Sequence, residues 1–494
     1  MKCADLKFPE KTKVNPSHGL EWLKLGLILI CFLVINLWTA GRSPTVWSDE
    51  VFVADPAANA LEGRGFITSA SVLGPNDLWA GNAPLHTWLL YLWFKCWGFG
   101  VLSVRSINYV YTAAALLLVW LTLRRSQLVK DDLRLLLIII LACQYDVTFC
   151  YRCGRYDCLG LLLIVAIAAA HTLAEGRRRA VLLLSLGFLL PFCGLQLLPF
   201  AVTAYGVAFF LGAGWCLLPA ALGVMAGGLF MIALWKSLGV WGNFQIMIAA
   251  NSGLNPDPLW QRLLFAPAPF LRGDPSLSLA VVALVVALIF CYREHIRWTR
   301  SKSIVALILM AFLVPLVMAG VGHFPIYYYW MADVPLVVAI FCLLALLPPS
   351  RRLARGCILF LLVCSAGLGF PARVGVVLSE WSQRDYRPVE EFVRAHVASG
   401  EKVGAAYSTF YAMREFGIDA VYEAHISSMT PSEKMAVDAM IIDPRTCFDF
   451  EATLGGSWVK EASFRQENPY RTGEADLYTL DYYQRQIADK SKMP

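Results

Sequence analysis

The amino-acid sequence predicts a mainly α-helical, polytopic membrane protein with a small α/β domain at its C-terminus. Of the 494 residues, 58% are hydrophobic and only 16% are charged, which leaves too little polar surface for a soluble protein of this size. Long apolar runs recur along most of the chain, and charged residues become frequent only from Arg373 onwards. We therefore expect a transmembrane domain over residues 1–371 and an α/β domain over residues 372–494.

Eleven apolar runs are candidates for membrane spans, since about 20 apolar residues are enough for a helix to cross a bilayer. The runs at 133–150 and 180–196 are short, so we expect them to be tilted, half-buried or re-entrant. The full set lies near residues 20–38, 102–123, 133–150, 158–174, 180–196, 198–214, 217–235, 277–292, 303–321, 327–348 and 356–371.

The distribution of Lys and Arg predicts the orientation. Between the spans, most basic residues fall in one set of short segments, although the loops on the opposite side are longer. The positive-inside rule places this set in the cytoplasm, together with the N-terminus. The odd number of spans then puts residues 372–494 outside the cytoplasm. The basic segments are 1–19, 124–132, 175–179, 293–302 and 349–355.

The first span shows no A-x-A cleavage pattern, so we expect it to be retained as an anchor. Fourteen cysteines occur in the chain, nearly all in or beside apolar runs. This distribution indicates buried structural cysteines and not a disulfide framework. Cys150, Cys153 and Cys158 have a metal-like spacing without a fourth ligand, and we interpret them as structural too.

The first outer loop, 39–101, and the C-terminal domain have recognisable local patterns. In the loop, Val51–Leu61 and Pro84–Phe99 carry apolar residues at helical spacing with several Trp, which is typical of helices in the membrane interface. In the C-terminal domain, Arg387–Val397 has a helical pattern, and Lys402–Tyr407 and Ala439–Ile442 are predicted strands.

Asp49 and Glu50 are the candidate catalytic residues, because they stand where the chain leaves its first span. Carboxylates close to a bilayer are costly unless they are hydrated or paired, so their presence favours a functional role. Such a carboxylate can accept a proton from an attacking hydroxyl or amine. The alternative is a pair of solvated loop acids next to a helix.

Three arginines are predicted to lie at the same membrane face: Arg105 at the start of the second span, and Arg152 and Arg155 at the end of the third. Guanidinium groups bind phosphate with two hydrogen bonds and stay charged, so a lipid-linked phosphate suits this cluster. Snorkelling to lipid headgroups is the alternative for any one of them. Asp157 is a candidate ion-pair partner of Arg155.

His86, His323 and Tyr328 are further candidates. His86 follows Pro84 at the start of an interfacial helix and is either an acid/base group, a ligand or a headgroup contact. His323 precedes the run Tyr327–Tyr329, which indicates an aromatic belt and places His323 within reach of a phosphate.

A divalent cation is the cofactor to consider for this loop. Four of its carboxylates, Asp49, Glu50, Asp55 and Asp77, are of the type that binds such ions. Because their sequence spacing defines no site, we expect no metal cofactor. No motif for nucleic-acid binding is found, and no nucleic-acid partner is expected.

Taken in order, several short motifs resemble the GT-C glycosyltransferases, in particular bacterial relatives of the dolichyl-phosphate-mannose protein mannosyltransferases and of the lipid A aminoarabinose transferase. The sequence departs from the family pattern at Leu190–Gly194, where the family lysine is absent. The matching motifs are Asp49-Glu50 after the first span, Ala83-Pro84-Leu85, Gly98 to Arg105, Arg155-Tyr156-Asp157, Leu186–Leu189 with Pro199, and His323 to Pro335.

The resemblance implies a cell-envelope enzyme of the bacterial inner membrane. Its donor would be a polyprenyl-phosphate sugar, and its acceptor a protein, a lipid or a glycan. An inverting hexosyl or pentosyl transfer would take place at the extracytoplasmic face. Asp49 would be the general base with Glu50 orienting it, and Arg105, Arg155 and His323 would steady the leaving phosphate.

Two other functional classes stay open from the sequence. A transporter or flippase of lipid-linked saccharides would explain the many spans, although such proteins usually have paired repeats and charges at the midplane. A non-catalytic assembly subunit would use residues 372–494 as its interaction module.

Overall fold

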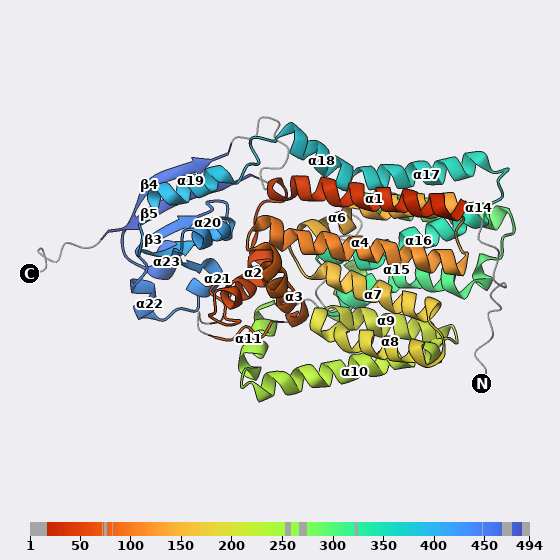
Figure 1. Cartoon of the computed structure of the whole chain (residues 1–494), viewed down its shortest axis with the longest axis horizontal. Helices are drawn as coiled ribbons and strands as arrows, with labels where there is room; N and C mark the ends of the chain where they lie inside the picture. Colours follow the sequence, from red (N-terminus) through yellow and green to blue (C-terminus); the bar gives the residue numbers. More distant parts are fainter. Residues whose placement is uncertain are drawn as a thin grey trace, which may run out of the picture.

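The computed structural model describes residues 17–71, 73, 77–81, 83–251, 258–265, 274–321, 325–446, 448–466 and 477–486. A bundle of helices makes up one end of the molecule and a domain containing a β-sheet makes up the other (Figure 1). The helices of the N-terminal part are α1 Ser17–Thr39, α2 Ser48–Leu61, α3 Pro84–Trp97, α4 Val101–Ser126, α5 Asp131–Cys143, α6 Tyr145–Arg152, α7 Asp157–Leu173, α8 Gly176–Leu189, α9 Leu197–Phe210, α10 Gly214–Ser237, α11 Trp241–Asn251, α12 Leu259–Phe265, α14 Pro275–Arg293, α15 Lys302–Val321, α16 Trp330–Leu346, α17 Arg352–Gly367 and α18 Phe370–Ser379.

The bundle has five to seven candidate membrane spans within the described residues. Helices α1, α4, α10, α14 and α15 are each long and apolar enough to cross a membrane. The pairs α5–α6 and α17–α18 pass the same criterion only if each bent pair is one span. The expected count of eleven is not confirmed, because several apolar runs form helices of 17 residues or fewer, too short to cross about 30 Å of hydrocarbon unaided.

The two bends meet each other inside the bundle. Helices α5 and α6 are bent by 58° at Gln144, and α17 and α18 by 42°. A Cβ added at Gly369, in the second bend, would lie only 2.1 Å from the carbonyl oxygen of Cys143 in the first. Gln144 accepts hydrogen bonds from Ser276 (2.6 Å) and Ser365 (2.9 Å), which ties the bend to α14 and α17.

Helices α8 and α10 pack with their backbones close together. A Cβ at Gly223 would come within 2.2 Å of the Leu184 carbonyl oxygen, and one at Gly227 within 2.1 Å of the Phe188 carbonyl oxygen. This small-xxx-small spacing is typical of close helix pairs in membranes, where packing contacts replace the hydrophobic driving force.

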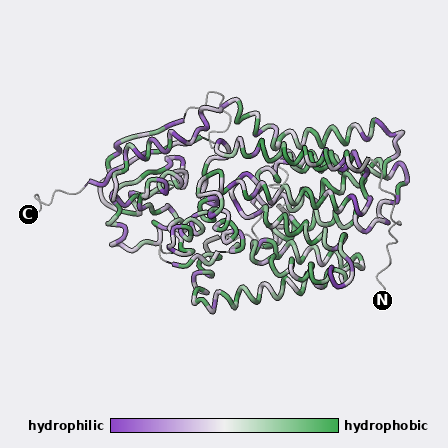
Figure 2. Tube along the Cα trace, in the orientation of Figure 1, coloured by the Kyte–Doolittle hydropathy of each residue, from purple (hydrophilic) through white to green (hydrophobic). Residues whose placement is uncertain are grey.

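Apolar residues dominate the bundle helices, and hydrophilic residues are more frequent in the C-terminal domain and at the opposite end of the bundle (Figure 2). Many large apolar side chains on the outer helices are exposed, such as Val202 on α9 and Phe230 on α10. Together with the candidate spans, this exposed apolar surface indicates an integral membrane protein.

The C-terminal domain contains a five-stranded sheet in the order β2-β1-β3-β5-β4. The first three strands in this order are parallel, and the last two join antiparallel. The predicted helix near 387–397 and the two predicted strands are confirmed, and β2, β4 and β5 are additional. The elements are α19 Arg387–His396, β1 Lys402–Ala405, the 3₁₀ turn η5 Tyr407–Thr409, α20 Phe410–Glu415, β2 Asp419–Tyr422, α21 Glu423–Ile426, α22 Pro431–Met435, β3 Ala439–Ile442, α23 Phe450–Leu454, β4 Trp458–Arg465 and β5 Thr479–Arg485.

The described part of the loop at 39–101 lies between the bundle and the sheet domain (Figure 1). Its two predicted helices are present as α2 and α3. One hydrophobic core joins α2 to the C-terminal domain, with fully buried Val51 on α2 and Phe410 and Val403 on the domain side. This shared core fixes the start of α2, where the two candidate carboxylates lie.

Candidate active site

Asp49 and Glu50 occupy the first turn of α2, after Trp47 in an extended conformation. Carboxylates are favourable there because the helix dipole is positive at its N-terminus. Neighbouring residues on a helix point about 100° apart, so the two side chains face different surroundings. Glu50 is completely buried, whereas the Asp49 side chain keeps 25% of its surface exposed.

Glu50 forms a buried, bidentate ion pair with Arg105. The Nε of Arg105 lies 3.1 Å from Oε1 of Glu50, and its Nη2 lies 2.7 Å from Oε2. The remaining guanidinium nitrogen donates to the backbone oxygens of Ala40 (2.6 Å) and Pro44 (2.8 Å). Tyr411 of the C-terminal domain donates to Oε1 of Glu50 at 2.7 Å. Arg105 therefore connects α4, α2 and the end of the first span.

Asp49 contacts Arg155, which forms a second ion pair with Asp157. The Nη1 of Arg155 donates to Asp49, and its Nε lies 2.7 Å from Oδ2 of Asp157. The guanidinium carbon lies 3.8 Å from the ring centre of Tyr327, and Nη2 lies 3.4 Å from the Tyr328 hydroxyl. The Arg155 and Asp157 side chains are almost fully buried, so Asp49 is the most accessible charge of this group.

Arg152 lies inside the bundle. Its Nη1 donates to the side chains of Asn36 (2.8 Å) and Thr39 (3.0 Å), and its Nη2 donates to the backbone oxygens of Thr39 and Ser43. With 1% of its surface exposed, Arg152 fastens the end of α1 to α6. The structure thus brings Arg155 into contact with Asp49 and engages Arg105 and Arg152 in interior contacts.

Gly154, between Arg152 and Arg155, allows this part of the chain to lie close to Glu50. Its φ of +66° is in the left-handed region that favours glycine. A Cβ at this position would lie 2.6 Å from Cγ of Glu50 and 2.9 Å from its Cδ. The chain can therefore pass directly over the buried Glu50–Arg105 pair before it reaches Arg155.

The remaining candidates lie apart from Asp49 or outside the described residues. His86 is fully buried on α3, 6.0 Å from the Tyr111 ring between centroids. Burial lowers the pKa of His86 to about 3, so its imidazole is neutral at physiological pH. His323 lies outside the described residues. Asp55 accepts a hydrogen bond from the Ser69 amide at 2.8 Å, and its fully buried side chain forms an ion pair with Arg414.

In the described part of the chain, no group of three or more His, Cys, Asp or Glu side chains is arranged to hold a metal ion. Cys150 and Cys158 have their sulfur atoms 3.4 Å apart, and both are buried as free thiols.

The C-terminal domain contributes side chains that sequence reasoning missed. Besides the Tyr411 hydroxyl, Arg414 contacts Asp55 and Asn59 on α2, the latter at 2.7 Å, and Glu62, the residue after α2, at 3.2 Å. Tyr411 and Glu50 are 361 positions apart, so no local pattern marks their contact. These bonds hold the C-terminal domain against α2, the helix that carries Asp49.

Glu423, which follows β2, is a partly exposed carboxylate of the C-terminal domain whose pKa is shifted far from its ordinary value. Burial, and after it the nearby Asp443 carboxylate, raise the pKa of Glu423 to about 7. The Thr446 hydroxyl donates to Glu423 at 3.5 Å. Glu423 therefore titrates in the physiological range.

Comparison with known proteins identifies the fold. No protein-family model and no curated protein sequence matches the chain. Among solved structures, the chain is similar to ArnT from Cupriavidus metallidurans bound to undecaprenyl phosphate, with a TM-score of 0.57 and 10% identity over 94% of this chain and 98% of that one. It is also similar to the arabinofuranosyltransferase AftD from Mycobacteria, with a TM-score of 0.50 and 12% identity over 94% of this chain. The match covers only 40% of the AftD chain. The chain therefore has the GT-C fold of membrane glycosyltransferases.

Proposed function

We propose that this protein is a membrane glycosyltransferase that moves a sugar from a polyprenyl-phosphate carrier to an acceptor. The contact between Asp49 and Arg155 carries the proposal, because it joins an accessible base to a buried cation. Transfer from a sugar phosphate needs both groups: the acceptor must lose a proton, and the leaving phosphate gains negative charge.

In the proposed step, the acceptor oxygen or nitrogen attacks the anomeric carbon of the donor sugar, and its proton passes to Asp49. The bond between the anomeric carbon and the phosphate oxygen breaks as the new bond forms. The electron pair leaves with the polyprenyl phosphate, whose charge the Arg155 guanidinium stabilises. A single displacement of this kind inverts the anomeric configuration. Asp157 keeps Arg155 in place from the opposite side.

Other candidates take supporting roles. Glu50 and Arg105 position Asp49 by holding the first turn of α2 against α4. Arg152 holds the end of α1. Tyr328 is uncharged, and its hydroxyl accepts a hydrogen bond from Nη2 of Arg155. His323, beyond the described residues, remains a candidate phosphate contact, and His86 supports α3 as a neutral group.

Two observations support a lipid-linked donor. The ArnT structure with a similar fold contains undecaprenyl phosphate. Trp47 and Tyr327, half-buried beside Asp49, pack edge to face with centroids 6.2 Å apart, and Trp and Tyr side chains are enriched where a membrane meets water. We infer a hexosyl or pentosyl donor, an extracytoplasmic site and an acceptor that is a protein, a lipid or a glycan.

The test uses purified wild type and Asp49→Asn, each incubated with radiolabelled polyprenyl-phosphate sugars and a membrane extract. We expect label to move into a new product with wild type and the rate to fall about 100-fold or more in Asp49→Asn, as loss of a general base requires. Asp419→Asn, which changes an exposed carboxylate on β2, is the matched control and should retain full activity.

Full transfer by Asp49→Asn would remove Asp49 from the mechanism. If wild type transferred label from no donor although it was folded, the transferase proposal would be wrong. Saccharide flux into proteoliposomes without a covalent product would then identify a transporter, and co-purification with a second transferase would identify an assembly subunit.

A further inference from the structure

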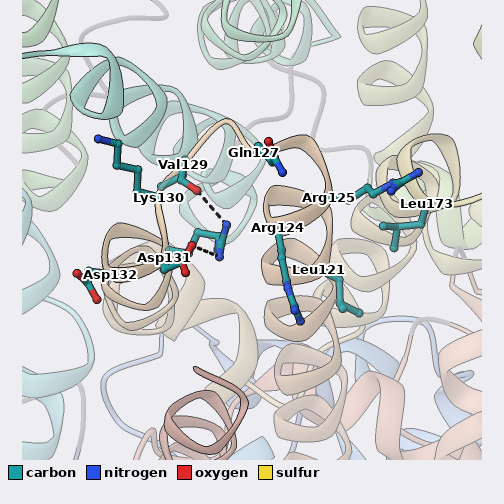
Figure 3. A pocket seen from close by; sticks show the side chains of 10 residues that line it. Leu121, Arg124, Arg125, Gln127, Val129, Lys130, Asp131, Asp132 and Leu173 are labelled. Atoms are coloured by element: carbon teal, nitrogen blue, oxygen red, sulfur yellow. Dashed lines mark hydrogen bonds and ion pairs between the residues drawn. The ribbon is translucent and has the colours of Figure 1, made fainter. Parts of the chain in front are cut away.

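Charged side chains gather at two places outside the candidate active site. One is a cavity of about 820 Å³ at the ends of α4, α5 and α7, where Arg134 pairs with Asp131 at 2.6 Å (Figure 3). Basic and acidic side chains are mixed along its wall, so it favours no ligand of one charge. The other place is the edge of the sheet at which the parallel strands β2, β1 and β3 end. We call four residues there the carboxyl edge: Glu423, Asp443, Arg445 and Thr446.

The strand order makes the carboxyl edge a switch point of the sheet. β1 lies between β2 and β3, and all three strands run parallel. After β1 the chain enters α20, in the core that contacts α2, whereas after β3 it reaches α23, in a separate core. Alternate residues of β3, Ile441 and Ile442, belong to these two cores, so the cores cover opposite faces. In open α/β sheets, ligands bind outside the carboxyl ends of the strands where connections diverge in this way.

Side chains of the loops after β2 and β3 meet at this edge. Oγ1 of Thr446, after β3, lies 3.5 Å from Oε1 of Glu423, after β2, although β1 separates the two strands. Arg445 is exposed and pairs with Asp443 at 2.6 Å. Within the part of the chain that the structure describes, Glu423 has no basic side chain at ion-pair distance. The edge therefore offers an unbalanced carboxylate beside a hydroxyl and a guanidinium group.

This combination suits the hydroxyl groups of a neutral sugar. A sugar hydroxyl both donates and accepts hydrogen bonds, so it can bond to carboxylates and also to a guanidinium or a threonine hydroxyl. The unbalanced charge of Glu423 opposes an anionic ligand. The loop after β1, residues 406–409, also lacks the glycines of a phosphate-binding loop. The Arg445 guanidinium, in turn, opposes a ligand with an ammonium group.

Tyr407 connects the carboxyl edge to the helix of the proposed base. Its ring packs edge to face with Phe52 on α2, with centroids 5.3 Å apart, and Phe52 lies about one turn after Asp49. Its hydroxyl accepts a hydrogen bond of 3.2 Å from the amide of Ala424, the residue next to Glu423. One tyrosine side chain thus spans the separation between α2 and α21, which begins at Glu423 (Figure 1). A saccharide of a few rings is long enough to extend from Glu423 toward Asp49.

We propose that the carboxyl edge binds a neutral saccharide of the acceptor, with Glu423 and Asp443 accepting hydrogen bonds from its hydroxyl groups and Arg445 and Thr446 donating to them. The acceptor is then a glycan. Its part in transfer rests on the proposed function, whereas saccharide binding by the carboxyl edge does not.

The first experiment measures binding to the full-length protein by saturation-transfer difference NMR, in a detergent without a sugar headgroup. The neutral probes are mannotetraose, cellotetraose and arabinotetraose, and the charged probes are tetragalacturonate and tetraglucosamine. We expect wild type to bind at least one neutral probe, and Glu423→Ala to weaken this binding about tenfold or more, because it removes hydrogen bonds to a charged group. Asp419→Asn, at the opposite end of β2, is the matched control and should bind as wild type does. If Glu423→Ala does not fold, Thr446→Ala, at an exposed position, should still weaken binding about fivefold.

Three results would overturn the proposal. The first is that wild type binds none of the neutral probes. The second is that the folded edge variants bind them as tightly as wild type does. The third is that tetragalacturonate or tetraglucosamine binds more tightly than every neutral probe, which would identify a charged ligand.

The second experiment repeats the transfer assay over a dilution series of the membrane extract that supplies the acceptor. Glu423→Ala should raise the amount of extract needed for the half-maximal rate about tenfold and leave the rate at saturation nearly unchanged, because Asp49 and Arg155 are intact. A lower saturating rate without this shift would contradict an acceptor site. Asp49→Asn should bind the neutral probe as wild type does. If wild type binds a neutral probe but transfers no label, the proposed transfer is wrong and the saccharide site stands.

Discussion

Replacing Glu50 with Gln tests whether the buried Glu50–Arg105 pair holds the candidate site together. Both side chains are at most 1% exposed, and three hydrogen bonds of 2.7–3.1 Å converge on the carboxylate. Breaking a buried pair by neutralising one partner costs about 3–5 kcal/mol, because the other charge stays buried without its counterion. Arg105 would keep its bonds to two backbone oxygens and at most one bond to the glutamine amide oxygen, without a counterion. We therefore expect the free energy of unfolding to fall by about 3 kcal/mol or more.

The assay is unfolding of purified protein in mixed micelles, with a transition followed by circular dichroism. Asp49→Asn is the matched control, since Asp49 is partly exposed and Arg155 retains its pair with Asp157. Its loss of stability should be about 1 kcal/mol or less. If Glu50→Gln is as stable as Asp49→Asn, the buried pair contributes no net stability and the positioning role of Glu50 is refuted.

Three further outcomes are expected. Gly154→Ala should lower stability by on the order of 2 kcal/mol in the same unfolding assay, because alanine is strained at a φ of +66° and its Cβ would overlap Glu50. Arg155→Lys should reduce the transfer rate about tenfold or more at unchanged donor concentration, because an ammonium group cannot replace the planar guanidinium between Asp49 and the phosphate; an unchanged rate would separate Arg155 from the leaving group. Glu423 has a pKa raised to about 7 in the folded protein, so its contribution to stability is full below about pH 4.5 and is lost as the pH rises through about 7. The thermal unfolding temperature of wild type should therefore fall between about pH 5 and pH 8 by more than that of Glu423→Gln. Identical pH profiles of the two proteins would contradict this prediction.

Much of the architecture follows from the sequence by itself. Apolar runs of bilayer length predict the bundle helices, and helical spacing of apolar residues in the first outer loop predicts α2 and α3. These features are local. Backbone hydrogen bonds and the apolar face of a helix involve residues within one or a few turns, so short stretches of sequence are enough to predict the helices. The position of Asp49 at the end of the first span, close to other charged groups, is local in the same sense.

The partners of each charge were decided only by the tertiary structure. The sequence presents Arg105, Arg152 and Arg155 as equivalent cations at one membrane face, yet only Arg155 contacts Asp49. The difference arises because the C-terminal domain and α4 close over Glu50, far away in sequence, and leave Asp49 as the exposed acid. Charge is a property of a residue type, whereas burial and pairing depend on which distant segments meet it.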